Sequence, residues 1–244
     1  PAAAVMPSVR ALLNRLIDYA GLFPPAKLDM ASTVRNYAEY LKCDHAWMLG
    51  RLIVPAARLD EFEQDAAGLL PRAIDGGVWQ ISTLASAAGS ADLEMDVERI
   101  EAFNARHEDE GAGRAIIDVV ELKADSSRAI VEAMKLLSDD VFAFFEVTID
   151  ADPLGLIEAI ADSGAGAKVR TGGVTADLYP SAANLARFIA RCADANVPFK
   201  ATAGMHHPLR HFANSVKADE FGFLNVFIAA SLALTDELDE AAIA

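Results

Sequence analysis

Two short apolar runs in this chain each contain a lysine and end near threonine and glycine. Residues 167–173 read AKVRTGG, with Lys168, and residues 198–204 read PFKATAG, with Lys200. An unpaired ammonium inside a protein costs several kcal/mol, so a lysine in such a run needs a partner or a chemical task. As a cation it can bind an anion, and as a neutral amine it can attack a carbonyl carbon.

The residues between the two runs predict the element that joins them. A helical pattern begins at Ser181 and places Leu185, Phe188 and Cys192 on one face. Two strands joined by a helix form one βαβ unit of roughly 30 residues or more, which is the spacing seen here. The two lysines are therefore expected on adjacent parallel strands whose carboxyl ends point the same way.

The same alternation of apolar runs and helical patterns extends through the chain of 244 residues. Runs without clean alternation predict a sheet that is covered on both faces. One domain, residues 1–244, is expected to form a closed (β/α)8 TIM barrel, preceded by an extra N-terminal helix that begins at Pro7. Its last strand lies in a segment, 222–234, that also fits a helix. The expected strands are 17–23, 49–55, 78–82, 114–121, 141–147, the two lysine runs, and 221–227.

Composition restricts the classes of partner. The chain is 53% hydrophobic and has a formal net charge of −15. An acidic surface argues against non-specific binding of nucleic acid or of anionic membranes. No apolar segment reaches the ~18 residues that span a bilayer and no signal peptide is apparent, so a cytoplasmic location is expected. Cys43 and Cys192 lack the spacing of a metal site, and no cofactor is expected.

Polar side chains gather in places where surface charge is not expected. Catalytic groups of a barrel lie at the carboxyl ends of its strands and in the loops that follow. Lys168, Arg170, Lys200 and Arg210 form a basic cluster, which indicates an anionic small ligand or, equally, ion pairs with nearby carboxylates. The charged or amide residues within or at the ends of apolar runs are Asp18, Arg51, Glu121, Glu146, Lys168, Arg170, Lys200 and Asn225.

The lysine runs resemble those of deoxyribose-phosphate aldolase, a class I aldolase family with a (β/α)8 fold. In that family one strand carries a lysine, two further residues and then Thr-Gly, and residues 168–172, KVRTG, match this spacing. The family's next strand reads FKPAGG, where residues 199–204 here read FKATAG. A third family run, Val-Asp-x-Val, is similar to residues 117–120, IDVV.

The resemblance implies roles for three residues. Lys168 would form an imine with the substrate carbonyl, Lys200 would lower the pKa of the Lys168 amine by like-charge repulsion, and Asp118 would take part in proton relay. This chain departs from the family at Arg170, where the family has a small residue, and at residues 205–208, MHHP. It also shows no clear Gly-Ser phosphate loop in the last strand. These departures argue against the sugar-phosphate substrate of the family more than against its fold.

The first functional hypothesis is therefore a lyase or aldolase-like enzyme that forms a lysine imine with a small anionic carbonyl compound. Lys168 would be the imine former and Lys200 the neighbouring cation, and Glu146 or Asp118 would move protons. The opposing interpretation is that Lys168 simply forms an interior ion pair with Glu146. The expected substrate-binding residues are Arg51, Glu121, Arg170, Thr171, Gly172, Gly173, Thr202, Gly204, His206 and Asn225.

Three further interpretations stay open. In an imine-free enzyme or binding barrel, the lysines and Arg170 would bind a carboxylate or phosphate and Glu146 or Glu121 would be the base. A metal site is a weaker alternative that rests on His206, His207 and His211, the last two at i and i+4 if Pro208 begins a helix. The last interpretation is a non-catalytic protein, in which the apolar residues 221–228 would form the subunit interface of a homo-oligomer.

Overall fold

The computed structural model describes residues 5–108, 111–235 and 240–244 of the chain. In these residues seven strands, β1 to β7, alternate with helices, which makes the fold α/β. The chain divides into two compact units, and each is described separately. One contains the chain up to Ala85 together with Glu94–Val120, and the other contains Ser86–Leu93 and Glu121–Ala244.

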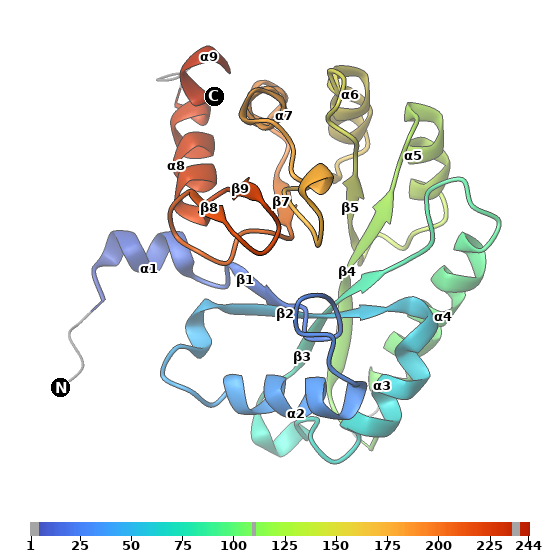
Figure 1. Cartoon of the computed structure of the whole chain (residues 1–244). Coiled ribbons are helices and arrows are strands. Elements are labelled where there is room, and N and C mark those ends of the chain that lie inside the picture. The colour runs from blue at the N-terminus through green and yellow to red at the C-terminus, as the bar shows by residue number, and fades with distance from the viewer. Residues whose placement is uncertain (1–4, 109–110, 236–239) are drawn as a thin grey trace. The chain divides into compact units, whose positions relative to one another are not determined.

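The first unit is built on parallel strands that follow one another in chain order. β1 pairs with β2 and β2 with β3, with Leu52 opposite Ile81. Helices α2 and α3 lie together beside β2 and β3 (Figure 1). Leu52 of β2, Ile81 of β3 and Phe62 of α3 have no solvent exposure. The elements of this unit are α1 (Pro7–Leu13), β1 (Ile17–Tyr19), α2 (Met30–Tyr40), η1 (Ala46–Met48), β2 (Leu49–Pro55), η2 (Ala56–Arg58), α3 (Leu59–Ala66), η3 (Ala73–Asp75), β3 (Trp79–Leu84), α4 (Leu93–Glu108) and the first part of β4 (Ala115–Lys123).

One side chain of α4 pairs with the backbone of β4. The Asn104 Nδ2 donates to the Ile117 carbonyl oxygen at 2.9 Å, and the Ile117 N–H donates to Asn104 Oδ1 at 2.8 Å. The N–H and C=O of one strand residue point to the same edge of the strand. Asn104 therefore occupies, at this residue, the place that a neighbouring strand takes in a sheet.

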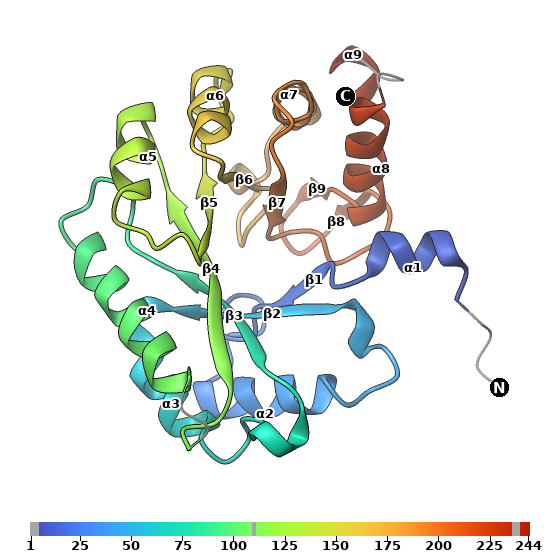
Figure 2. The same ribbon diagram turned by 180° about the vertical axis from the view of Figure 1, so that it is seen from behind.

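The second unit repeats the βα pattern. β5 pairs with β6 and β6 with β7, all parallel. Figures 1 and 2 both show α5, α6 and α7 in a row next to these strands. The elements are the end of β4, α5 (Ser127–Met134), β5 (Phe142–Glu146), α6 (Leu154–Asp162), β6 (Gly166–Arg170), η4 (Ala176–Leu178), α7 (Ala182–Asp194), β7 (Phe199–Thr202), β8 (His211–Ala213), β9 (Ala218–Glu220), α8 (Phe223–Leu234) and α9 (Glu240–Ile243).

The predicted helix between the lysine strands is confirmed. In α7 the Ser181 hydroxyl accepts a hydrogen bond from the Asn184 N–H, which is the usual N-cap contact. Leu185, Phe188 and Cys192 are buried on one face, as the spacing predicts. Residues 167 and 169 of β6 have no solvent exposure, so their side chains belong to the core while Lys168 lies on the other face of the strand.

The prediction of a closed eight-stranded barrel is wrong. The eighth strand, expected over 221–227, is absent because Phe223–Leu234 forms helix α8. This run is rich in Ala and Leu, which favour helix, and twelve residues exceed the usual strand length. The two strands that follow β7, β8 and β9, pair with each other in antiparallel fashion instead. In the described part of the chain no helix is both long and apolar enough to cross a membrane.

Candidate active site

A network of five charged side chains lies on the strands of the second unit. The Lys168 ammonium lies 2.8 Å from Glu121 Oε2 and 2.9 Å from Glu146 Oε2. The Lys200 ammonium lies 2.7 Å from the other oxygen of Glu121, Oε1. The strand register explains this geometry, because Glu146 is opposite Lys168 and Lys168 is opposite Lys200 on neighbouring parallel strands. The predicted ion pair between Lys168 and Glu146 is thus present.

The centre of this network is buried. The side chain of Glu121 is 2% exposed and that of Lys168 is 7% exposed. Burial raises the pKa of Glu121, but the charges and hydrogen bonds of Lys200 and Lys168 outweigh burial and lower this pKa to about 2. Glu121 is therefore a carboxylate at neutral pH, and each of its oxygens accepts from one lysine.

The rim of the network is more accessible. The side chain of Arg170 is 45% exposed, and its Nε lies 3.7 Å from Glu146 Oε1. The side chains of Glu146 and Lys200 are 12% and 19% exposed. Lys200 Nζ also lies 5.4 Å from the centre of the Phe144 ring. Arg170 and Lys200 are the cations, and Glu146 the carboxylate, that a ligand can reach with the least rearrangement.

The Thr-Gly sequences after β6 and β7 hold the two strand ends together. The Thr171 hydroxyl donates to the Ala203 carbonyl oxygen at 2.6 Å, and the Thr171 N–H donates to Thr202 O at 2.8 Å. A Cβ on Gly172 would lie 2.8 Å from the Cα of Gly204, so these backbones touch. Gly204 has a φ of +73°, a conformation that glycine adopts without strain. These residues, expected to bind substrate, have a packing role whether or not they also contact a ligand.

Sequence reasoning missed a second group in the same unit. The Tyr179 hydroxyl lies 2.8 Å from Glu220 Oε1 and 3.1 Å from the Gly173 carbonyl oxygen. The second oxygen of Glu220 lies 3.5 Å from His211 Nε2. Burial and the Glu220 carboxylate raise the pKa of Tyr179, so its hydroxyl keeps the proton that it donates. No periodicity marks these residues, because Tyr179 lies in a loop and Glu220 in a three-residue strand.

The histidines do not support the metal hypothesis. The i, i+4 spacing of His207 and His211 required a helix from Pro208, but His211 begins strand β8 instead. The rings of His207 and His211 are close, with centroids 4.2 Å apart, while His206 is exposed. Among the described residues no group of three or more His, Cys, Asp or Glu side chains is arranged to hold a metal ion.

Two other predicted residues, Arg51 and Asp118, pair with each other in the first unit. Arg51 Nε and Nη2 donate to the two oxygens of Asp118 at 2.7 and 2.8 Å. Gln80 Nε2 also donates to Asp118, at 2.9 Å, and the Arg51 N–H donates to Asp18 Oδ1 at 2.7 Å. A guanidinium and a carboxylate in this fork geometry satisfy each other. The proton-relay role of Asp118 therefore stays a prediction.

Asn225 lies on a helix, contrary to the predicted strand. It is in the first turn of α8, and its Oδ1 accepts from the Arg210 N–H at 2.9 Å. The N–H groups of Phe223 and Leu224 donate to the carbonyl oxygens of His207 and Pro208, both at 3.1 Å. Free N–H groups at a helix N-terminus commonly bind phosphate. Here the carbonyl oxygens of His207 and Pro208 accept from two of these N–H groups, which agrees with the absence of a phosphate loop in the sequence.

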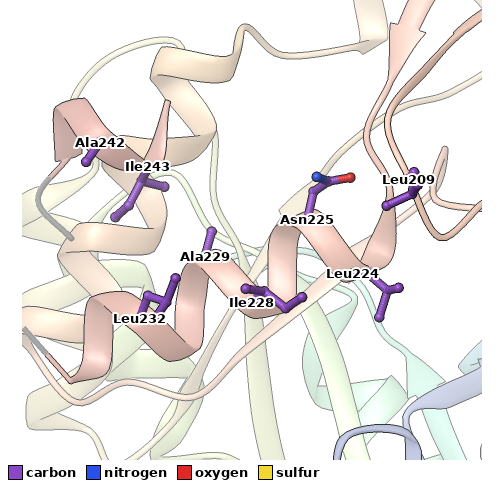
Figure 3. Close-up of a pocket in the computed structure, with 8 residues that line it drawn as sticks. All are labelled: Leu209, Leu224, Asn225, Ile228, Ala229, Leu232, Ala242 and Ile243. Atoms are coloured by element: carbon purple, nitrogen blue, oxygen red, sulfur yellow. The ribbon is translucent and has the colours of Figure 1, made fainter. Parts of the chain in front are cut away.

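A shallow groove shares no residue with the charged network. Figure 3 shows its lining side chains along α8, with Leu209 at one end and α9 at the other. Its volume is about 240 Å³, and Asn225 is the one amide among aliphatic side chains. The lining residues are Leu209, Leu224, Asn225, Ile228, Ala229, Leu232, Ala242 and Ile243.

Comparisons with known proteins supply no family. Neither the scan of protein-family models nor the search of curated proteins finds a match for this chain. The functional argument therefore depends on the geometry of the charged network itself.

Proposed function

We propose that this chain is an enzyme that acts on a small molecule with a carboxylate or phosphate group, without forming an imine. Arg170 and Lys200 bind the anionic group, and Glu146 is the general base. The observation that carries the proposal is the position of the Lys168 ammonium between Glu121 and Glu146, at 2.8 and 2.9 Å. The partner class is a small anionic molecule, and two cysteines without a disulfide favour the cytoplasm as the location.

The chemistry of Lys168 favours the imine-free route. An ammonium places a positive charge between the two carboxylates, whereas a neutral amine would leave them without it. An imine former must lose a proton before it attacks a carbonyl carbon. In this site that loss also removes the counter-charge that keeps Glu121 and Glu146 together, at a cost of several kcal/mol for a buried carboxylate.

Binding measurements test the anion site. We expect inorganic phosphate or a small carboxylate to bind the wild type in isothermal titration calorimetry. Arg170→Ala should weaken this binding about tenfold or more, since it removes a charge-assisted hydrogen bond. Arg191→Ala is the matched control, because Arg191 forms a more peripheral pair with Asp152. Equal affinities for the wild type and Arg170→Ala, or no binding of any anion, would refute the proposed site.

Proton exchange tests the base. Glu146 next to a bound keto acid should remove a proton from the carbon beside the keto group. Incubation with small keto acids in D2O, followed by NMR, should show deuterium incorporation by the wild type and none by Glu146→Gln. If Glu146→Gln incorporates deuterium as fast as the wild type, another group is the base.

An aldolase-like enzyme is the second candidate. It is favoured by one observation: the ammonium groups of Lys168 and Lys200 contact the two oxygens of one carboxylate, so two cations are neighbours. The test is mass spectrometry after sodium borohydride with small aldehydes and keto acids, on the wild type, Lys168→Ala and Lys200→Ala. A stable adduct that requires Lys168 would make this candidate the primary one. The imine-free proposal expects no adduct that depends on either lysine.

A further inference from the structure

The loop between β6 and α7, residues 171–181, follows directly after Arg170. Residues 174–177 at its tip are exposed, and Val174 is 62% exposed. Near its start lie Gly172 and Gly173, where neighbouring side chains leave no room for a Cβ. The loop thus has a solvated tip and a start that only glycine fits, beside the most exposed cation of the network.

Beyond the Thr171 contacts at its start, one residue attaches this loop to the neighbouring hairpin. The hydroxyl of Tyr179 donates to Glu220 on β9 at 2.8 Å. Its ring packs against both strand ends, because a Cβ on Gly172 or Gly204 would lie 2.7 or 3.0 Å from Tyr179 Cε1. Glu220 is 8% exposed, so the acceptor of this hydrogen bond is largely shielded from water. The hairpin β8–β9 that carries Glu220 is in turn bound to α8 through the Arg210 N–H and Asn225.

We infer that residues 173–179 form a lid at the carboxyl end of β6, which is held closed by the hydrogen bond between Tyr179 and Glu220. Residues 171–172 stay packed against residues 202–204, and opening breaks the Tyr179 contact so that residues 173–179 move away from β9. What the lid covers rests on the proposed function, since the anion would bind at Arg170, immediately before the loop. Loops that close over an active site are commonly fastened by few contacts and open on their own.

Hydrogen exchange of the full chain tests the lid without any ligand. In Tyr179→Phe the ring remains and only the hydroxyl is lost. Exchange of amides 173–179 should become about tenfold faster, because a hydrogen bond to a charged group contributes at least this factor to a local closing equilibrium. Exchange in β6 and α7 should not change. Tyr40→Phe is the matched control, because Tyr40 is 45% exposed.

Two results would overturn the inference. One is unchanged exchange of residues 173–179 in Tyr179→Phe. The other is faster exchange throughout β6, α7 and the loop, which would mean that the contact stabilises the whole unit. Inorganic phosphate separates the lid from the proposed function. If calorimetry shows no phosphate binding, the anion site fails while the ligand-free exchange still decides the lid. If phosphate binds but does not slow exchange of the loop, the lid fails and the anion site stands.

Discussion

At Glu121 the cost of burial and the attraction of two ammonium groups act in opposite directions. The folded pKa is about 2, below the ordinary value of 4.5, so the attraction prevails. Because the folded pKa is lowered, Glu121 contributes stability above about pH 4.5 and loses this contribution as the pH falls toward about 2. The network is therefore a source of stability at neutral pH.

Replacing Glu121 should reveal this dependence. Glu121→Gln leaves two lysines without their shared carboxylate and should lower the free energy of unfolding by about 3 kcal/mol at pH 7. The difference from the wild type should shrink below pH 4.5, as measured by urea denaturation at several pH values. Glu132→Gln, which removes an exposed pair with Lys135, is the control and should have little effect. A difference that is constant from pH 7 to pH 3 would contradict the assigned pKa.

Two buried hydroxyl groups have the opposite effect on stability. Thr33 and Thr83 have no solvent exposure, and their Oγ1 atoms have no hydrogen-bond partner among the described residues. A buried hydroxyl without a partner costs about 1–3 kcal/mol, and valine has nearly the same shape. Thr33→Val and Thr83→Val should each raise the free energy of unfolding by about 1 kcal/mol in urea, whereas Thr148→Val, at an exposed position, should not. Destabilisation by both substitutions would show that the hydroxyl groups are in fact satisfied.

The charged network could be predicted in part from single residues. The pair of Lys168 and Glu146 follows from adjacent strands of equal length, where register places the two side by side. The contact between Tyr179 and Glu220 could not be predicted, since neither residue belongs to a periodic segment. Arg51, chosen as a polar residue in an apolar run, and Asp118, chosen from the family resemblance, both lie on strands, but their pairing depends on packing between strands that sequence alone does not specify.

At the level of elements, Asn104 is an example of a side chain that replaces backbone pairing. Asn104→Ala leaves the N–H and C=O of Ile117 without these partners, which should cost about 2 kcal/mol. Asn104→Asp keeps the acceptor for the Ile117 N–H and should cost less. Urea denaturation of the two variants gives the comparison. Equal losses of stability would mean that the acceptor for the Ile117 N–H contributes nothing.

Strands and helices with strong periodicity were predicted well. β2 has the expected bounds, Leu49–Pro55, and α7 has the expected cap and buried face. The last strand was not predicted correctly. An apolar run of Ala, Leu and Phe fits a buried strand and a helix equally well until the length of the run is considered. The hairpin β8–β9 was missed because strands of three residues are too short to show alternation.

At the scale of the whole chain, net charge is the dominant electrostatic feature. A formal charge of −15 makes the folded state repel itself, and salt screens this repulsion over about 10 Å at 0.1 M. Raising NaCl from about 20 to about 300 mM should therefore raise the Tm by a few degrees in differential scanning calorimetry. A falling Tm would show that exposed ion pairs outweigh the repulsion, although such pairs usually contribute little.

The contact between Asn104 and Ile117 also has a consequence for association between molecules. An open strand edge with unpaired N–H and C=O groups is a template on which another chain can add a strand. Asn104 covers that edge at Ile117 with a side chain that cannot propagate a ladder. Ile117 has no solvent exposure, so Asn104→Ala makes this edge available only where α4 moves off β4; on mild heating, Asn104→Ala should therefore form aggregates at concentrations where Thr148→Val stays monodisperse in light scattering.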